Sequence, residues 1–156
     1  MAVTVELITR LGCSADEAWE HVQKSALLHH IAAPLIRFRP QDQPFPERWT
    51  PGEYRANMRF AGVLPAGWQA VVISFPEPRG DTRFVRDNGY GPLIKRWDHW
   101  IVIEPHGESA TRYTDRVHIE AGVLTPFVAA FARSFYGHRQ ERWRDLVRTQ
   151  FAALRR

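Results

Sequence analysis

The feature that most constrains the fold is a change in hydrophobic period between Glu120 and Thr125. Before this point, from Glu53 onward, apolar residues occupy alternate positions in several runs, as is typical of half-buried β-strands. After it, apolar residues recur every three or four positions as far as Leu154, which predicts one amphipathic helix of about 28 residues. Consecutive antiparallel strands followed by one long helix predict an α+β fold in which the helix covers the apolar face of the sheet.

The N-terminal segment predicts one strand and two short helices. Val3 to Leu11 alternates between apolar and polar residues, which favours a first strand. Ser14 to Glu17 has the pattern of a capping box at a helix N-terminus. Ser25 begins a second short helix, which must end near Pro34 because the residue before a proline is pushed out of helical geometry.

Further strands are predicted from alternating runs that turn residues separate. The runs cover residues 54–60, 69–75, 83–87, 97–103 and 113–119, with turns at Pro65–Gly67, Pro76–Gly80, Asn88–Pro92 and Pro105–Ser109. The segment 40–51 is rich in proline and contains Phe45 and Trp49, so we expect an ordered loop that covers an apolar surface. In total we expect a curved sheet of about seven strands.

Length and composition are those of an ordinary globular protein. A chain of 156 residues with 44% hydrophobic and 24% charged residues predicts one domain, residues 1–156. Cys13 is the single cysteine, which excludes a disulfide within the chain and a cysteine-rich zinc site. No apolar run approaches the roughly 18 residues that span a bilayer, and no secretory signal is visible. We therefore expect a cytoplasmic location and no membrane span.

The formal net charge of +4 raises the question of nucleic-acid binding. The basic residues are scattered along the chain and acidic residues lie between many of them, which is more typical of a solvated surface, so we expect no nucleic-acid partner. We expect no metal, because the adjacent His29 and His30 would point apart on a helix. We also expect no cofactor, because no helix follows Gly89-x-Gly91 as a nucleotide-binding loop requires. The sequence leaves open whether the chain forms a homodimer.

The order of the predicted elements implies a cavity. A large curved sheet wrapped around one helix cannot fill all the space between them, and apolar cavities with a few polar groups are the usual sites for small ligands. The same order of elements resembles the helix-grip fold of the START-like superfamily, also called SRPBCC, which has polyketide cyclase/dehydratase and lipid-transfer branches. Three stretches are similar to bacterial members: Gly91–Leu93 followed by Trp97–Trp100, Ala110–Val117, and Phe135–Arg139 followed by Trp143. The chain departs from the bacterial pattern at Ile101, where a second histidine often stands, and in a longer gap before Trp97.

His99 and Asp115 are the strongest candidates for chemistry, because both lie on the apolar phase of their strands. If the hairpin turns about Gly107, they face each other directly. The same register pairs Trp97 with Val117 and Ile101 with Tyr113. A carboxylate beside a buried imidazole would hold one tautomer and raise the pKa of the histidine, leaving the other ring nitrogen as donor or general base. The alternative is a polar pair that only satisfies itself in the core.

The predicted ligand-binding residues combine inward-facing strand positions with one face of the long helix. They are Tyr54, Met58, Phe60, Gln69, Val71, Ile73, Val85, Asp87, Trp97, His99, Ile101, Tyr113, Phe127, Phe131, Phe135 and Arg139. A turn near Gly80 would place Val85 opposite Ile73 and Asp87 near Val71. Asp87 would anchor a ligand or lie at an exposed strand end. Arg139 would pair with a carboxylate such as Asp87 or reach an acidic ligand.

Three functions are compatible with these residues. The first is binding of a small hydrophobic or aromatic molecule between the sheet and the helix. The second, implied by the resemblance, is a polyketide cyclase/dehydratase-like enzyme with His99 as general base, Asp115 orienting it, and Tyr113 or Arg139 stabilising a developing enolate. The third is a protein-interaction module, which an exposed apolar patch around Trp100 and Val102 would support.

Overall fold

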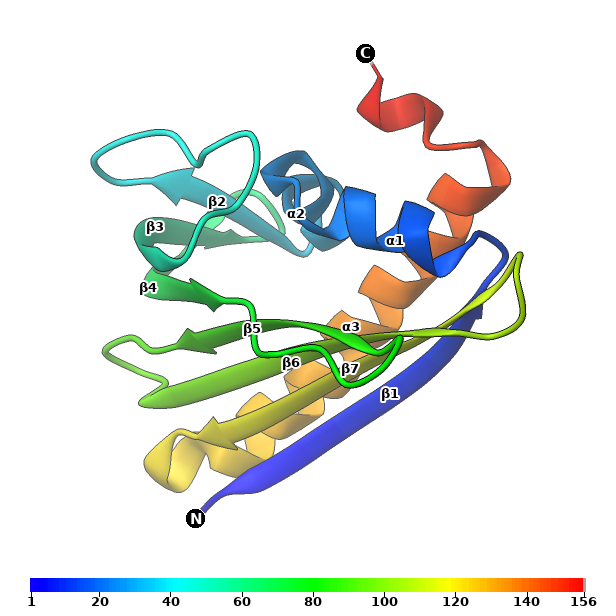
Figure 1. Ribbon diagram of the computed structural model, residues 1–156. Coiled ribbons are helices and arrows are strands. Elements are labelled where there is room, and N and C mark those ends of the chain that lie inside the picture. Colours follow the sequence, from blue (N-terminus) through cyan, green and yellow to red (C-terminus); the bar gives the residue numbers. More distant parts are fainter. Residues whose placement is uncertain (156) are drawn as a thin grey trace.

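The computed structural model describes residues 1–155, which form one antiparallel sheet and a set of helices covering one of its faces (Figure 1). In chain order the elements are β1 (Val3–Leu11), α1 (Ala15–Val22), α2 (Ser25–Ala32), β2 (Ile36–Pro40), β3 (Gly52–Phe60), β4 (Leu64–Ser74), β5 (Arg83–Gly89), β6 (Arg96–Pro105), β7 (Thr111–Glu120) and α3 (Thr125–Arg148). Two short 3₁₀ turns, η1 (Gly122–Leu124) and η2 (Ala152–Leu154), flank α3.

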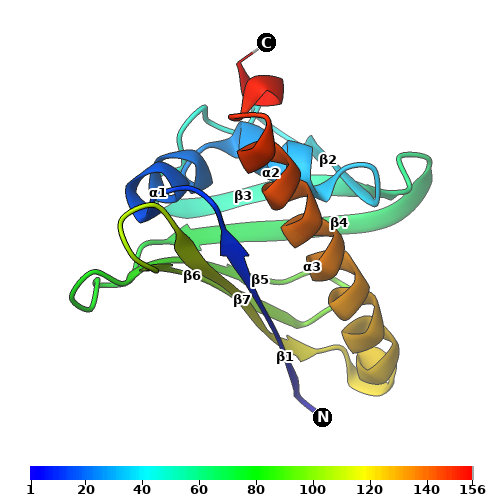
Figure 2. The same ribbon diagram turned by 90° about the vertical axis from the view of Figure 1, so that its right-hand side faces the viewer.

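The seven strands follow the order β1-β7-β6-β5-β4-β3-β2, so the chain adds consecutive hairpins and β1 closes the edge beside β7. β1 pairs with β7 from Val3 opposite Ile119 to Leu11 opposite Thr111. Figures 1 and 2 show α3 crossing one face of the curved sheet, with α1 and α2 near its C-terminal end. The predicted helix-grip α+β architecture, with two short helices after the first strand, is confirmed.

β2 is a strand that the sequence analysis did not predict. It pairs with β3, placing Ile36 opposite Phe60 and Phe38 opposite Met58. Its alternation is short and ends at Pro40, so its composition resembles that of a loop. Proline is acceptable here because β2 is an edge strand, where one face of the backbone needs no partner.

The turn between β3 and β4 lies earlier than the sequence predicts. Leu64 already belongs to β4, and the chain reverses at Ala61 and Gly62, both of which have positive φ angles. The register then shifts between Asn57 and Arg59. Pro65–Gly67, predicted as the turn, therefore falls inside β4 at an irregular step in the ladder, where Gly67 takes its positive φ of 78°.

The long helix α3 begins at the predicted place and ends earlier than predicted. It covers 24 residues, with Pro126 in its first turn, where a missing backbone N–H costs nothing. The Thr125 hydroxyl donates to the Gly122 carbonyl and accepts from the Ala121 amide, bracing the entry to the helix. After Arg148 the helix stops, and the left-handed backbone conformation of Phe151 reverses the chain. This reversal buries the Phe151 ring.

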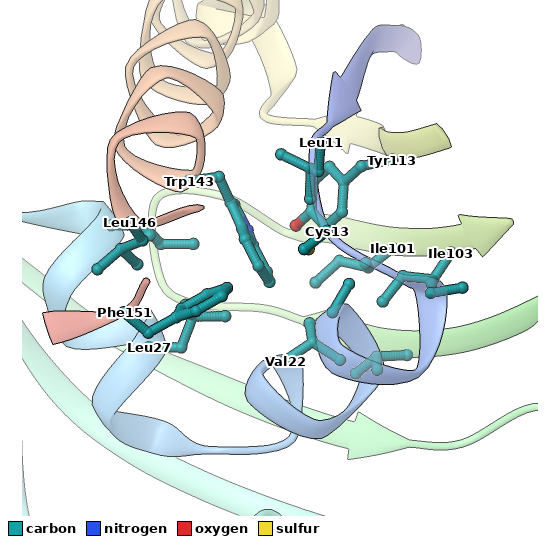
Figure 3. Close-up of a cluster of buried hydrophobic side chains, with 14 residues drawn as sticks. Leu11, Cys13, Val22, Leu27, Ile101, Ile103, Tyr113, Trp143, Leu146 and Phe151 are labelled. Carbon is teal, nitrogen blue, oxygen red and sulfur yellow. The ribbon is translucent and has the colours of Figure 1, made fainter. Parts of the chain in front are cut away.

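One end of the molecule has a tightly packed core at the C-terminal half of α3. Trp143 is fully buried and lies between Tyr113 and Phe151, with ring centroids 5.1 and 6.2 Å away (Figure 3). Leu27 of α2 and Val22 of α1 complete this cluster from the other side. Burial of several large side chains here ties α1, α2, β7 and α3 together.

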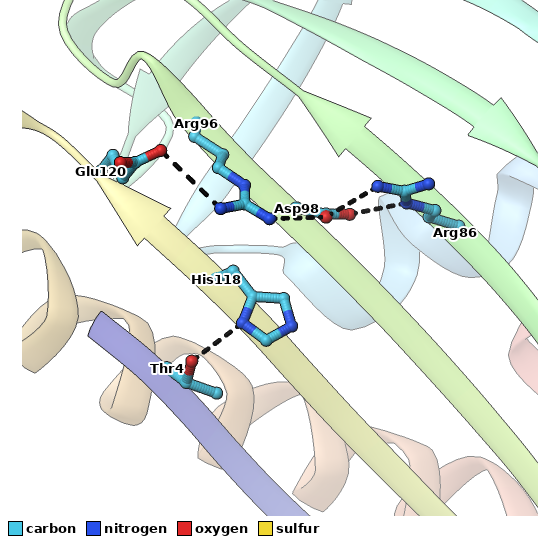
Figure 4. Close-up of polar contacts among 6 residues, drawn as sticks. All are labelled: Thr4, Arg86, Arg96, Asp98, His118 and Glu120. Carbon is cyan, nitrogen blue, oxygen red and sulfur yellow. Dashed lines mark hydrogen bonds and ion pairs between the residues drawn. The ribbon is translucent and has the colours of Figure 1, made fainter. Parts of the chain in front are cut away.

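The outer face of the sheet is covered by polar contacts. Asp98 is 1% exposed and accepts two hydrogen bonds from Arg86, each 2.9 Å long, and one from Arg96 (Figure 4). Trp100 is half-buried, with the Arg86 guanidinium 4.9 Å from its ring centroid, and Val102 is 7% exposed. The region around Trp100 and Val102 therefore lacks the exposed apolar patch that would have supported a protein-interaction module.

Candidate ligand-binding cavity

Two adjoining cavities lie between the sheet and α3. The larger has a volume of about 90 Å³ and is walled by β2, β3, β4, β6 and α3. The smaller, of about 50 Å³, extends toward α1, α2 and the proline-rich loop. Five residues line both cavities: Leu28, Val71, Asp87, His99 and Arg139. The two spaces are thus neighbouring parts of one site.

Most of the residues predicted to bind a ligand line these cavities. They are Met58, Gln69, Val71, Ile73, Val85, Asp87, Trp97, His99, Ile101, Phe131, Phe135 and Arg139. The alternation of strand residues presents every second side chain to the same side, which is why the pattern located them. Their role in binding remains a prediction.

Two predicted lining residues lie near the surface instead. Phe127 is 75% exposed, although it shares four-residue spacing with Phe131 and Phe135. Four residues exceed one helical turn, so each step rotates the side chain by about 40°, and two steps carry Phe127 away from the sheet. Phe60, at the end of β3, is 39% exposed and packs against Phe131 at 5.7 Å.

Two predicted tyrosines belong to packed regions beside the cavities. Tyr54 packs 5.1 Å from Trp49 and donates its hydroxyl to the Thr50 carbonyl at 2.7 Å, so the proline-rich loop covers it. Tyr113 is fully buried against Trp143, and its hydroxyl donates to Asp115 at 3.4 Å. Tyr113 therefore lines neither cavity, and the prediction that it is a lining residue is wrong.

Several lining residues were not predicted. They are Val22, Leu27, Leu28, Ile31, Ile36, Phe38, Trp49, Ile94 and Tyr136. Those of β2 were missed because the strand itself was missed. Tyr136 could have been found, since it lies three positions before Arg139 and therefore on the same face of α3. Trp49 fits the expectation that the proline-rich loop covers an apolar surface.

His99 and Asp115 are joined as expected, but through a different register. Asp115 lies directly opposite Ile101, while His99 lies opposite Val117, so the predicted pairing is wrong by two residues. A two-residue shift preserves which face each side chain occupies, and diagonal neighbours remain within reach of long side chains. His99 Nε2 is 2.7 Å from Asp115 Oδ1, with both residues buried.

The protonation of this pair follows from its surroundings. Asp115 also accepts hydrogen bonds from Gln140 at 3.1 Å and from Tyr113, which suits an ionised carboxylate, so Nε2 of His99 is the nitrogen that carries a proton. Burial lowers the pKa of His99, and this effect outweighs the opposing influence of Asp115. The expected increase in that pKa is therefore wrong, because loss of hydration exceeds the gain from the ion pair. At neutral pH the imidazole is uncharged and Nδ1 can accept a proton.

Asp87 lies where the ladder between β4 and β5 is open. Those strands pair only at Ile73 with Asp87 and Ser74 with Arg86, before an isolated bridge at Ala70 and Tyr90. The predicted position of Val85 opposite Ile73 is thus displaced by two residues. In the gap, Asp87 Oδ1 accepts a hydrogen bond from the Val72 amide at 2.8 Å. Burial raises the pKa of Asp87 to about 7, so the protonated and ionised forms of this carboxyl group are both populated near neutral pH.

Gly89, the last residue of β5, and Gly91, just after the strand, let the chain pass close to β4 beside this gap. A Cβ atom at Gly91 would lie 2.7 Å from the Trp68 carbonyl oxygen, and one at Gly89 would lie 2.9 Å from that of Ala70. The Gly89–Gly91 segment thus has a packing role beside the cavity wall at Gln69.

Arg139 is the most unusual group in the cavity. Its side chain projects from α3, the residue is 6% exposed, and its Nε has no hydrogen-bond partner among residues 1–155. The guanidinium carbon lies 5.6 and 5.1 Å from the ring centroids of Phe135 and Tyr136. Burial acts to lower the pKa of Arg139, but the nearby Asp115 and other acidic groups raise it overall, so the guanidinium is charged.

Potential metal ligands and the single thiol can be located in the part of the chain that the structure describes. Residues 1–155 contain no group of three or more His, Cys, Asp or Glu side chains placed to hold a metal ion. Cys13 is buried, and burial raises the pKa of its thiol to about 11, so it is protonated and poorly nucleophilic at neutral pH. Among the same residues, no helix has the length and apolar character needed to cross a membrane.

Solved structures with this architecture include proteins of several kinds. A START superfamily protein from Mycobacterium smegmatis is 15% identical, with a TM-score of 0.65, and the match covers 94% of this chain and 98% of that one. A norcoclaurine synthase point mutant from Thalictrum flavum, in complex with a transition-state analogue, is 10% identical with a TM-score of 0.67 and 96% coverage of both chains. The Zhui aromatase/cyclase from Streptomyces sp. R1128 is 12% identical, with a TM-score of 0.58 and coverage of 100% and 97%. At sequence identities this low, the structural likeness establishes a shared fold and nothing more specific.

Sequence comparison places the chain in a family. No curated protein matches the sequence. One family pattern matches residues 9–148, which run from the end of β1 through the last residue of α3 and so include every residue that lines the two cavities. The chain has the START-like, or SRPBCC, helix-grip fold, and it belongs to the family described as Domain of unknown function (DUF8410).

Proposed function

We propose that residues 1–156 act as a single START-like domain that binds a small hydrophobic or aromatic molecule between the sheet and α3. The observation that carries this proposal is the pair of adjoining cavities, whose walls are mainly aliphatic and aromatic side chains. A few polar groups, Gln69, Asp87, His99 and Arg139, point into otherwise apolar surroundings. Such a combination is typical of small-molecule sites, where apolar contact supplies affinity and polar groups supply orientation.

The size of the cavities favours a ligand of about one ring. Their volumes of about 90 and 50 Å³ are small for a lipid or a polycyclic molecule. An apolar cavity of roughly 150 Å³ binds benzene in another protein, which gives the scale. Half-buried Leu28 and Met58 in the walls can change rotamer and admit a somewhat larger molecule.

A cavity-filling variant tests this proposal. The wild type is screened with single-ring compounds such as phenol, benzaldehyde and benzoate, and we expect at least one to raise the melting temperature. Val71→Phe should remove this shift, because Val71 lines both cavities. Val72→Phe is the matched control, since adjacent residues of a strand face opposite sides. No shift in the wild type, or an equal shift in Val71→Phe, would contradict ligand binding at this site.

A second candidate is a cyclase/dehydratase-like enzyme, which the geometry of His99 favours. Asp115 fixes the tautomer of His99, leaving Nδ1 to take a proton from a carbon next to a carbonyl group. The electron pair would move onto the carbonyl oxygen, where the charged Arg139 would stabilise the enolate. His99→Gln should abolish turnover of a carbonyl substrate while preserving its binding. Retained turnover in that variant would exclude His99 as the base.

A further inference from the structure

The strongest unexplained group in the molecule is the buried guanidinium of Arg139. It borders both cavities, and Nε lacks a partner. The ion pairs found among residues 1–155 do not include it. A buried guanidinium N–H without an acceptor is costly, and a ligand acceptor in the cavity would remove that cost.

The carboxylates near Arg139 are already engaged elsewhere. Asp115 accepts hydrogen bonds from His99, Gln140 and Tyr113. Asp87 accepts one from the Val72 amide. Both acids influence the guanidinium through space, but neither forms an ion pair with it. The donors of Arg139 therefore remain available to a molecule in the cavity.

We propose that Arg139 binds the carboxylate of the ligand, so that this site selects small aromatic or short aliphatic acids over neutral molecules of the same shape. The proposal rests on the proposed function, because it names the ligand class of the same cavity. The planar guanidinium matches a carboxylate with two parallel hydrogen bonds, a geometry that a neutral amide or alcohol cannot reproduce.

The aromatic side chains around Arg139 fit the rest of such a molecule. The guanidinium lies over the rings of Phe135 and Tyr136, and these contacts restrict its orientation at the cavity wall. Tyr136 accepts a 2.8 Å hydrogen bond from Trp97 Nε1, so its ring is also fixed. The apolar body of the acid would then lie against Phe135, Trp97 and Val71, all of which line the larger cavity.

The other titratable groups around the site determine its charge. His99 is uncharged at neutral pH, and Asp115 balances Arg139. Burial raises the pKa of both Tyr113 and Tyr136, so their hydroxyls stay protonated. Asp87 remains as the variable group, with a pKa of about 7. When it is protonated the site carries no net charge before the acid enters, and when it is ionised it repels the acid.

Calorimetric titration with matched acids and amides tests the proposal. The probes are benzoate with benzamide, and phenylacetate with phenylacetamide, since each pair differs mainly in charge. For the wild type we expect at least tenfold tighter binding of each acid than of its amide, and a weaker preference as the pH rises through 7. Arg139→Met should remove the preference while retaining amide binding, and Arg133→Met, on the exposed side of α3, should leave it unchanged.

The outcomes separate this proposal from the proposed function. Equal binding of acid and amide in the wild type, or an unchanged preference in Arg139→Met, would overturn the role of Arg139 while leaving ligand binding intact. Failure of all four probes to bind would overturn both. If Arg139→Met does not fold, the wild-type comparison still decides, and the NMR signal of the Arg139 Nε–H must shift with acid and not with amide.

Discussion

The Asp115 carboxylate receives hydrogen bonds from three side chains while remaining 1% exposed. His99 and Tyr113 lie on the sheet and Gln140 lies on α3, so this single residue joins the two layers. Hydrogen bonds to a charged acceptor are among the stronger ones in proteins, and leaving their donors unpaired in a dry interior adds to the cost.

We expect Asp115→Asn to lower the free energy of unfolding by about 2–4 kcal/mol, because the amide cannot accept all three hydrogen bonds and one donor is left unpaired. Urea denaturation measures this loss. Asp145→Asn is the control, since its carboxylate is about half exposed and, within the described part of the chain, forms an ion pair only with Arg148. A loss in Asp115→Asn no greater than that of the control would show that the network contributes little.

The lowered pKa of His99 predicts a specific dependence of stability on pH. The folded protein binds a proton at His99 less readily than the unfolded chain, whose histidine has a pKa near 6.5. This difference does not affect the free energy of unfolding above pH 6.5. As the pH falls toward the folded-state pKa of His99, it lowers the free energy of unfolding, because the unfolded state then binds more protons.

His99→Gln, which can still donate to Asp115, should therefore lose less stability than the wild type between pH 7 and pH 5. Denaturation midpoints at several pH values measure the difference between the two proteins. His21, His29 and His30 also have lowered pKa values through burial, but they are present in both proteins and cancel. Parallel curves for the two proteins would mean that His99 does not resist protonation.

Among the elements, most strands could be predicted from alternating apolar residues, whereas the pairing across the connecting loops could not. β6 and β7 were predicted because inward-facing residues occupy alternate positions in the runs 97–103 and 113–119, which fall inside the observed strands. Their register was wrong by two, because the hairpin loop from His106 to Ala110 does not centre on Gly107. Nothing in the composition of a loop that long specifies which of its residues pair across it.

Gly91 offers a test of how closely β4 is approached at the gap. Gly91→Ala should lower the free energy of unfolding by about 1–3 kcal/mol, since its new Cβ would lie 2.7 Å from the Trp68 carbonyl oxygen. Gly137→Ala is the matched control: its nearest new contact is Leu7 at an ordinary 3.8 Å, and alanine in a helix should stabilise by about 1 kcal/mol. Thermal unfolding of both variants would show opposite signs, and equal signs would contradict the prediction.

At the scale of the whole molecule, the sheet and the helices pack through two hydrophobic clusters, and the cavities lie beside both of them. Trp143, Phe151 and their neighbours fill the end beside α1. Ala129 and Ala132, nearer the start of α3, belong to the second cluster, and Phe131, Phe135 and Arg139 border the larger cavity. The same elements thus form both the hydrophobic core and the walls of the cavities.

Phe151→Ala should destabilise the protein by about 3 kcal/mol, although Phe151 lies beyond the long helix and near the end of the chain. The ring is 2% exposed, stacks on His21 at 3.7 Å and meets Trp143 edge-on. Phe127→Ala, at a 75% exposed position, should change stability by less than about 0.5 kcal/mol. Similar losses in both variants would argue against a stabilising role for the C-terminal turn.

The residues that line the site were more predictable from the sequence than the volume of the cavities or the contacts of Arg139. Alternation placed Val71, His99 and Ile101 on the inner face, and helical spacing placed Phe135 and Arg139 opposite them. The volume of the cavities and the isolation of Arg139 depend on side-chain packing between elements far apart in sequence. No local pattern specifies such contacts, and an unrecognised strand such as β2 removes part of the wall from any sequence-based description.

The gap between β4 and β5 gives the protein an internal reporter. Because the Val72 amide donates to a side chain instead of a backbone carbonyl, its electronic environment follows the protonation of Asp87 directly. In ¹H–¹⁵N spectra the Val72 resonance should titrate with a midpoint near 7, while that of Ser74, beside the regular part of the ladder, stays constant. The Val72 peak would then report the charge state of Asp87, and a ligand that changes this charge state would shift the peak without itself carrying a label.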